Sequence, residues 1–295
     1  MNVSEACQLL GYSKQAYYKK IKIAENKALK EYLTVELIRE KRKIWKQGSG
    51  RNLLACLRPE LNAHGIKIGR DKFFDLLGRH NLLIKYKSKR AITTNSYHFY
   101  KRYPNLIKDT IPNKPNQVWV SDITYVWTRR EEKFLYLFLI TDMYSRKIVG
   151  YYISRSLKAK GAVKALKTAL MQAEQTGFES LTHHSDRGIQ YCCYQYTGIL
   201  KANNVSISMT ENSDPLENAI AERVNRTIKQ EFSNNYRSGY TSVREARTKI
   251  KQSIEFYNQI RPHRSIEMLT PNEAHKKQGY LERKWKNYKS FKSLN

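Results

Sequence analysis

Three β-rich runs follow Pro115, and helical and extended segments alternate after them. Short polar connections separate the three runs, so an antiparallel meander is predicted. The subsequent order of helix, strand, helix, strand and helix predicts an α/β fold whose sheet is antiparallel on one side and parallel on the other. In chain order, the predicted strands and helices cover 118–127, 134–140, 148–153, 160–174, a short strand running into Asp186, 191–203, 205–209, 217–232 and 242–257.

The first ninety residues are predicted to be all helical. Ser4 and Ser13 can cap two short helices joined by a glycine-containing turn, which is typical of a helix-turn-helix, and a longer helix is predicted over 25–47. A second pair, at 52–63 and 70–79, predicts another helix-turn-helix-like DNA-binding region. A polar stretch with several prolines follows and is interpreted as a linker. The predicted divisions are 1–50, 51–90, the linker 91–114, the α/β core with its C-terminal helix 115–275, and a basic tail 276–295.

The net charge of the chain is +28, from 54 Lys and Arg against 26 Asp and Glu. A charge of this size attracts a polyanion and contributes affinity through counterion release. Tyr is also abundant, with 21 residues, and the stretch 17–20 places two of them beside two lysines, which suits phosphate contacts combined with stacking. No strongly amphipathic basic helix stands alone, as binding to a membrane surface would require. The predicted partner is therefore nucleic acid.

The sequence also argues against a membrane-spanning or zinc-dependent fold. Its longest apolar run, 134–140, is far too short to cross a bilayer, and the N-terminus lacks the charged and apolar parts of a secretory signal. We therefore expect a cytoplasmic protein. The four cysteines form no C-x-x-C pair, so reduced and packed thiols are expected in place of a structural zinc site.

Asp122 is the acid whose position is hardest to explain structurally. It stands inside the run 118–126, which carries apolar residues on both faces and is expected at the centre of the sheet. Asp is depleted in strands, and an unpaired buried carboxylate is costly. A neutralising partner is implied, which is either Lys or Arg or a divalent cation.

Two further acids lie where they could join Asp122. Asp186 ends a predicted strand. Glu222 lies on a predicted helix, on one face with Asn218, Asn225 and Lys229, since successive residues are rotated by about 100°. That face can present a carboxylate to a metal and an ammonium group to a phosphate.

Each of these acids also has a structural interpretation when it is taken singly. Asp186 could be a turn or helix-cap residue, and Glu222 a solvated helix residue. Asp142 falls in a turn region and is interpreted as a turn former. His183 and His184 could be ligands, but a pair of histidines at a strand end is more often packed or hydrogen-bonded.

Taken together, the acids resemble the catalytic triad of the DDE recombinases with an RNase H-like core. These are the retroviral integrases and, more closely, the OrfB-type transposases of the bacterial insertion-sequence-three family. Asp122, Asp186 and Glu222 are separated by 63 and 35 intervening residues, and Lys229 lies seven residues after Glu222, where the family has Lys or Arg. Glu217 stands where the family often has Asp. The motifs that carry the resemblance are 119–125 (WVSDITY), 142–150 (DMYSRKIVG), 184–191 (HSDRGIQY), 217–223 (ENAIAER), 257–263 (YNQIRPH) and 269–274 (LTPNEA).

The resemblance implies an RNase H-like mixed five-stranded sheet with flanking helices, and a Mg²⁺-dependent polynucleotidyl transferase. Such an enzyme cleaves element ends and joins the freed 3′ hydroxyl to another phosphodiester. Two Mg²⁺ or Mn²⁺ ions about 3.5–4 Å apart activate the nucleophile and stabilise the leaving oxygen, and carboxylates are suitable ligands. We expect Asp122 to bridge both ions, and Asp186 and Glu222 to complete one site each.

The resemblance also implies partners and leaves alternatives open. Double-stranded DNA is the expected substrate, bound by a homodimer or larger multimer at the bacterial nucleoid, and an upstream-frame polypeptide is an expected partner. An RNase H-like DNA nuclease and a catalytically inactive DNA-binding regulator remain as alternatives. The residues expected to contact DNA are Lys229, Arg223, Asn225, Lys85, Lys87, Lys89 and Arg90.

Overall fold

The protein is described by a computed structural model, and the chain divides into two compact units. The helical unit comprises residues 1–43 and 49–84, and the α/β unit comprises residues 44–48 and 85–295. The residues that the structure describes are 2–84, 99–174, 177–211, 215–232 and 239–284. The predicted DNA contacts Lys85, Lys87, Lys89 and Arg90, and most of the predicted basic tail, therefore lie outside the described residues.

The helical unit begins with a short helix and a very long one. Asn2, and not the predicted Ser4, caps the first helix by accepting a hydrogen bond from the Glu5 backbone N–H, whereas Ser13 caps the second as predicted, with Ala16 as donor. The predicted boundary between two helices near residue 25 is wrong. The second helix is continuous because no Gly or Pro interrupts it. The helices of this unit are α1 (Val3–Leu9), α2 (Lys14–Ile44), α3 (Gly50–Ala63) and α4 (Arg70–Arg79).

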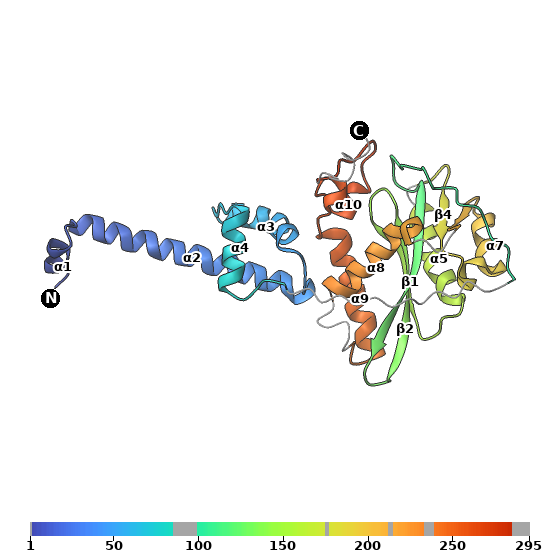
Figure 1. Ribbon diagram of the computed structural model, residues 1–295, viewed down its shortest axis with the longest axis horizontal. Helices are drawn as coiled ribbons and strands as arrows, with labels where there is room; N and C mark the ends of the chain where they lie inside the picture. The colour runs from blue at the N-terminus through green and yellow to red at the C-terminus, as the bar shows by residue number, and fades with distance from the viewer. Residues whose placement is uncertain (1, 85–98, 175–176, 212–214, 233–238, 285–295) are drawn as a thin grey trace, which may run out of the picture. The chain divides into compact units, whose positions relative to one another are not determined.

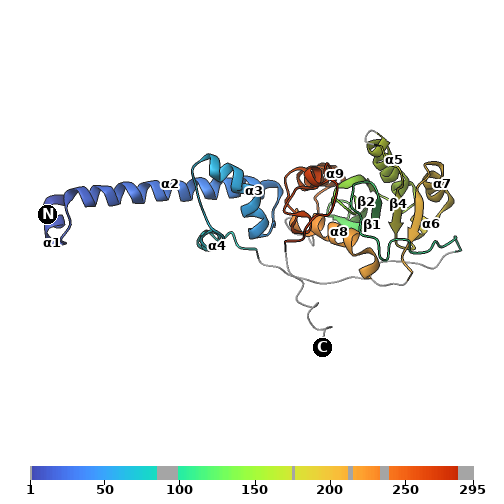
Figure 2. The same ribbon diagram turned by 90° about the horizontal axis from the view of Figure 1, so that it is seen from above.

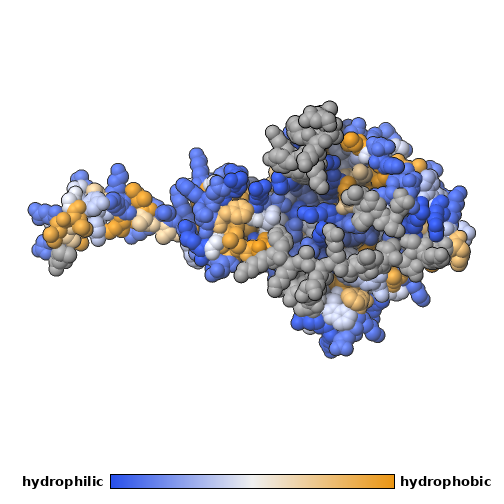
Figure 3. Space-filling model, viewed as in Figure 1, coloured by the Kyte–Doolittle hydropathy of each residue, from blue (hydrophilic) through white to orange (hydrophobic). Residues whose placement is uncertain are grey.

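The two halves of α2 have different surroundings. Thr34, Val35 and Ile38 are buried in the second half. Residues 17–30 of the first half are all exposed, and apolar side chains gather on its surface and on that of α1 (Figure 3). Contacts within this half are local, such as the edge-to-face pair Tyr17 and Tyr18 and the Lys20 ammonium group over the Tyr12 ring, so local propensity contributes much of what keeps it helical. The exposed large apolar residues are Val3, Leu9, Leu10, Tyr12, Tyr17, Tyr18, Ile21, Ile23, Leu29 and Tyr32.

The helical pair α3 and α4 has its own small core. Leu53, Leu57 and Leu61 of α3 are buried, as are Phe73 and Leu77 of α4. The turn between the helices begins at Gly65, whose φ of 63° suits a residue without a side chain. This pair confirms the helices predicted at 52–63 and 70–79.

The α/β unit contains a five-stranded mixed sheet. Strands β1, β2 and β3 form an antiparallel meander, while β1, β4 and β5 run parallel, in the order β3-β2-β1-β4-β5. This order and these directions are those of an RNase H-like sheet, and they confirm the predicted fold class. The strands are β1 (Val118–Thr128), β2 (Lys133–Asp142), β3 (Ile148–Ser154), β4 (Thr182–Ser185) and β5 (Ser206–Met209).

Helices cover both faces of the sheet (Figures 1 and 2). Helices α5, α6 and α7 lie on one face, and α8 and α9 on the other. The helix predicted at 191–203 is interrupted, because Cys193 has extended backbone, and the helix predicted from 217 opens with a 3₁₀ turn. The helical elements are α5 (Lys160–Glu174), α6 (Ile189–Cys192), α7 (Tyr194–Ala202), η1 (Pro215–Asn218), α8 (Ala219–Glu231), α9 (Val243–Gln259), η2 (Arg264–Ile266) and α10 (Pro271–Ala274).

The pleat of β1 separates two kinds of environment. Trp119 points into the main core, which it shares with Phe138, Leu166 and Tyr196 on the side of α5 to α7. Even-numbered residues such as Val120 point to the other face, where α8 packs. Asp122 belongs to this second set, so the fold directs its side chain toward α8. Within the described residues, every helix is too short or too polar to span a bilayer.

Candidate active site

Asp122 lies at the centre of the sheet and faces α8. Its side chain is half-buried and accepts two hydrogen bonds, one at 2.8 Å from the backbone N–H of Ile123 and one at 2.8 Å from the Asn225 side-chain amide. The strand therefore places a carboxylate under a helix, and both of these hydrogen-bond donors are uncharged. This satisfies the sequence prediction that Asp122 is central in the sheet.

Asp186 follows the last residue of β4, the parallel neighbour of β1. Paired residues of the two strands differ by 64 in number, from Val118 with Thr182 to Val120 with His184. If the same pairing continues for two more residues, Asp186 lies opposite Asp122. Neighbouring strands are about 4.8 Å apart, so the two carboxylates are close. Asp186 Oδ1 accepts a hydrogen bond of 3.1 Å from the Gly188 backbone N–H, which holds the carboxylate at the end of the strand.

Glu222 lies in the first turn of α8, and two asparagines attach this helix to β1. The side-chain amide of Asn218 donates to the carbonyl of Ser121 at 2.9 Å, and that of Asn225 donates to Asp122. The helix residues Ala221, Val224 and Ile228 are buried against the sheet, while Glu222 is half-buried. These buried residues form an apolar stripe along the helix, and Glu222 lies outside it.

The three carboxylates act on one another electrostatically. Burial, the negative charge of Asp186 and, more weakly, that of Glu222 together raise the pKa of Asp122 to about 7. The hydrogen bonds from Asn225 and Ile123 favour the ionised form and oppose this rise of the pKa. A cation at this position would remove both unfavourable contributions, because it compensates the buried charge and the mutual repulsion.

The ligand geometry is open in this structure. Within the described part of the chain, no three Asp, Glu, His or Cys side chains converge closely enough to hold a metal ion. Asp122, Asp186 and Glu222 are thus brought from distant segments into electrostatic range of one another, but they do not form a closed ligand set. Oxygen ligands of this type suit hard divalent cations.

The other predicted residues of α8 differ in exposure. Arg223 is exposed, and Lys229 is half-buried, with a pKa that burial lowers and the charge of Asp122 raises. Lys229 therefore lies close enough to Asp122 for their charges to interact, and its contact with a DNA phosphate stays a prediction. Asn225 is buried and directed at Asp122, a contact that the sequence does not reveal.

The histidine pair before Asp186 is packed and hydrogen-bonded. His183 Nε2 lies 2.7 Å from the Ser121 hydroxyl and 2.9 Å from the Tyr196 hydroxyl, and burial lowers its pKa to about 3. His184 Nδ1 lies 2.8 Å from the Ser208 hydroxyl, and burial lowers its pKa to about 4. The hydrogen bond between neutral His183 on β4 and Ser121 on β1 thus connects the two strands next to Asp122. The sequence gives no signal for the contact between Ser121 and His183, because it depends on the register between two strands.

Asp142, another acid of the core, ends β2 and supports the turn that follows it. Its side chain is fully buried and accepts hydrogen bonds from the backbone N–H groups of Asn116 and Ser145 and from the Ser145 hydroxyl. It has no place among the three carboxylates. The interpretation of Asp142 as a turn former agrees with these contacts.

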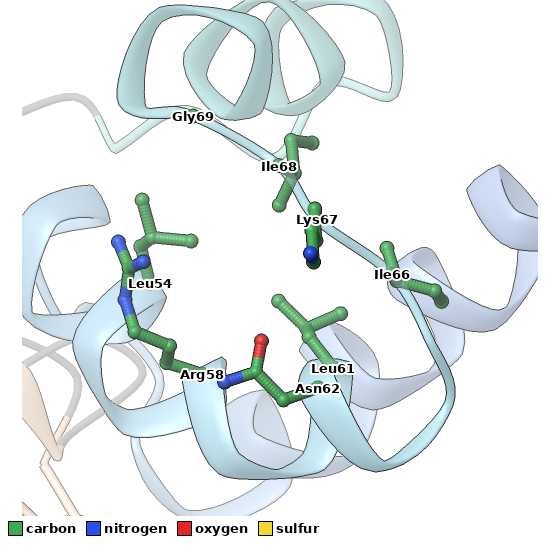
Figure 4. A pocket seen from close by; sticks show the side chains of 8 residues that line it. All are labelled: Leu54, Arg58, Leu61, Asn62, Ile66, Lys67, Ile68 and Gly69. Atoms are coloured by element: carbon green, nitrogen blue, oxygen red, sulfur yellow. The ribbon is translucent and has the colours of Figure 1, made fainter.

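A separate hollow of about 410 Å³ lies in the helical unit (Figure 4). Its walls come from α3 and from the segment that leads into α4, and they combine apolar side chains with the cations Arg58 and Lys67. None of the predicted site residues lines it. The lining residues are Leu54, Arg58, Leu61, Asn62, Ile66, Lys67, Ile68 and Gly69.

Comparison with known proteins places this geometry in context. Residues 112–215 and 203–271 match two families that are both described as integrase core domains. The chain is 36% identical over 270 residues to an uncharacterised 31 kDa protein of insertion element IS600 from Shigella sonnei, covering 90% of this chain and 95% of that protein. It is 30% identical over 223 residues to transposase InsF of insertion sequence IS3A from Escherichia coli K12, with 75% of each chain covered.

Solved structures of viral integrases also match parts of this chain. The catalytic core domain of HTLV-2 integrase in complex with magnesium is 14% identical and covers 56% of this chain and 99% of that chain, with a TM-score of 0.42. An intasome of simian T-cell lymphotropic virus is 16% identical and covers 80% of this chain and 78% of that chain, with a TM-score of 0.47.

Proposed function

Because the chain belongs to the insertion-sequence-three (IS3) family of bacterial transposases with an integrase-like core, we propose that Asp122, Asp186 and Glu222 are the catalytic residues of this DNA transposase. The protein is a DDE polynucleotidyl transferase and depends on a divalent metal. The assignment of its catalytic residues rests on one observation. Asp122 on β1, Asp186 after β4 and Glu222 on α8 lie close enough for their charges to interact. Burial and the repulsion from the other two acids raise the pKa of Asp122 to about 7.

The chemistry of the three acids fits a pair of Mg²⁺ or Mn²⁺ ions. When bound, two such ions activate the attacking oxygen and stabilise the leaving oxygen of a phosphodiester. The carboxylates of Asp122, Asp186 and Glu222 would together hold these ions. Asn225 keeps one oxygen of Asp122 in a fixed direction, and Gly188 does the same for Asp186.

The basic residues of α8 would hold the DNA backbone at this site. Lys229 lies in the field of Asp122 and is the residue we assign to a phosphate beside the reacting one. Arg223 is exposed on the same helix and can reach a more distant phosphate. Asn225 is buried, so we assign it to the support of Asp122 in preference to the predicted DNA contact.

Further DNA contacts would come from the helical pair α3 and α4 and from the basic stretch that contains Lys85, Lys87, Lys89 and Arg90. The net charge of +28 supports a large phosphate footprint. We further propose that the protein works at the nucleoid as a homodimer or larger multimer. A transposase must bring two element ends together, and an upstream-frame polypeptide would help to bind them.

Substitution of the acids tests the assignment. A labelled duplex with a terminal 3′ hydroxyl is incubated with the full chain, Mg²⁺ and a target duplex. We expect Asp122→Asn to reduce joined products by more than about 100-fold, since even outer partners of metal ligands typically contribute 10-fold to 100-fold. Asp186→Asn and Glu222→Gln should have effects of the same size, with DNA binding in EDTA retained.

A matched control and a contrary outcome complete this test. Glu255→Gln removes an exposed acid of α9 and should leave joining unchanged. Equal joining by wild type and Asp122→Asn would refute the catalytic assignment. Cleaved products without any joined products would favour an RNase H-like nuclease over a transposase.

A further inference from the structure

A short segment of the α/β unit, Ile44–Gly48, meets the C-terminal end of α8. Trp45 is fully buried, and its ring lies 5.6 Å from that of Phe256 and 6.5 Å from that of Phe232. The indole N–H donates a hydrogen bond of 2.7 Å to Glu231 Oε2, although 186 positions separate the two residues. The backbone N–H of Gln47 donates at 2.8 Å to the carbonyl of Glu231, one of the carbonyls that a helix end leaves without a partner.

Glu231 is also held from a third segment. Arg261 donates from Nε to Oε2 at 2.8 Å and from Nη2 to Oε1 at 2.7 Å, while its Nη1 lies 2.9 Å from His263 Nε2. Both side chains of this ion pair are nearly buried, with 6% and 11% exposure. The carboxylate of Glu231 thus receives three N–H groups, which is the condition under which a buried ion pair is tolerated.

These contacts complete a set of three attachments along α8. At the start of the helix, Asn218 donates a hydrogen bond to β1, and in its middle Asn225 donates one to Asp122. At its end, the last residue, Glu231, accepts hydrogen bonds from Trp45 and Arg261. Each residue of an α-helix is rotated by about 100° and advanced by about 1.5 Å. A helix held at several levels can neither rotate nor slide, so its attachments determine where Glu222 and Lys229 point.

We propose that Trp45, Glu231 and Arg261 are positioning residues for the catalytic helix α8. This proposal rests on the proposed function, because it names the residues that set Lys229 and Glu222 against the DNA phosphate and its metal ions. Lys229 lies two residues before Glu231 and depends most directly on this attachment. The segment 44–48 is joined at both ends to the helical unit, which ends at residue 43 and resumes at residue 49. Trp45 of this segment donates its hydrogen bond to Glu231 of α8.

Hydrogen exchange of the full chain tests the attachment independently of activity. Trp45→Phe keeps a ring but loses the N–H donor, and Trp45→Ala loses both. We expect amide exchange in the last turn of α8 to rise at least tenfold in Trp45→Ala and by an intermediate factor in Trp45→Phe, with α5 unchanged. Trp127→Ala is the matched control, because it removes a half-buried indole from β1 that packs on Phe134, and it should leave exchange in α8 at the wild-type rate.

The joining reaction shows whether the attachment positions the site. At saturating DNA we expect joining to fall roughly tenfold in Trp45→Phe, which loses a hydrogen bond to a charged group, and on the order of 100-fold in Trp45→Ala. The Mg²⁺ concentration for half-maximal joining should rise in both variants, which a loss of stability alone would not cause in the folded fraction. Trp127→Ala should join at the wild-type rate.

The outcomes separate this proposal from the proposed function. If wild type shows no Mg²⁺-dependent joining, the proposed function fails, while the exchange of α8 still decides the attachment. Unchanged α8 exchange in Trp45→Phe, or wild-type joining and Mg²⁺ dependence in that variant, would overturn the positioning role. If Trp45→Ala does not fold, Trp45→Phe alone decides by the same criteria.

Discussion

At the scale of single residues, Gly188 lies so close to the Asp186 carboxylate that a larger residue would crowd it. A Cβ added there would lie 3.0 Å from Asp186 Oδ1 and 3.1 Å from Gln190 Oε1, while its φ of −66° is open to alanine. We predict that Gly188→Ala displaces the Asp186 carboxylate and raises the Mg²⁺ concentration for half-maximal joining about tenfold. Gly198→Ala is the control, because Gly198 lies in α7 with open space around it. It should leave the Mg²⁺ titration unchanged and raise stability by up to about 1 kcal/mol.

Buried histidines make a second residue-scale prediction. Burial lowers the pKa of His183 to about 3 and that of His263 well below its ordinary value. Their contribution to stability is complete above the unfolded pKa of about 6.5 and is lost as pH falls, by up to about 1.4 kcal/mol per unit and residue. Asp122 has a raised pKa, so its contribution is present below about 3.9 and is lost as pH rises through about 7. The two histidines outweigh the one acid, so the urea midpoint of the full chain should fall from pH 6.5 to pH 5.

The acids could be predicted from the sequence, whereas their supports could not. Asp122 stands out because a carboxylate inside an apolar strand is rare. Asn225 has no such signal, since an amide on a polar helix face is ordinary until a strand residue is found beneath it. Ser121 and His183 are in the same position, because their contact depends on the register between two strands that are distant in sequence.

At the scale of elements, the sequence predicts the strands and most helices, and it fails where the signals of helix ends are weak. The short helix predicted from Ser13 and the longer one predicted over 25–47 merge into α2, because capping residues mark possible starts and do not impose ends. The opposite error occurs at Cys193, where the chain leaves helical geometry without Gly or Pro. Packing of α6 and α7 against the sheet decides that break, and packing is not visible in local propensity.

The two halves of α2 lead to an element-scale prediction. Ala24 and Ala28 lie in the exposed half, so Ala24→Gly with Ala28→Gly should lower the helix signal in circular dichroism at a cost of about 1 kcal/mol each. The melting of the α/β unit should not change, because both residues are exposed and belong to the helical unit. Ala169→Gly in α5 is the contrasting variant, since Ala169 is fully buried. If the α2 variant shifted the main melting transition as much as Ala169→Gly does, the first half of α2 would contribute to the stability of the α/β unit, contrary to this prediction.

At the scale of the whole molecule, the division into a helical unit and an α/β core follows from the change of pattern near Pro115. The insertion of residues 44–48 into the α/β unit does not. Trp45 reads as one more apolar residue near the end of a helix, and its partner Glu231 is 186 positions away. Nothing local in the sequence connects the two, so only the folded chain reveals that Trp45 donates a hydrogen bond to the last residue of α8.

The charge of the whole chain leads to the final prediction. A net charge of +28 should make DNA binding strongly dependent on salt. For six to ten phosphate contacts, affinity for a duplex falls by about 10³-fold to 10⁵-fold between 50 and 200 mM salt. We expect this slope for the full chain in EDTA, measured by fluorescence anisotropy with duplexes of arbitrary sequence. Lys229→Gln and Arg223→Gln should each reduce the slope by about one, whereas a nearly flat dependence would mean that the charge does not bind phosphates.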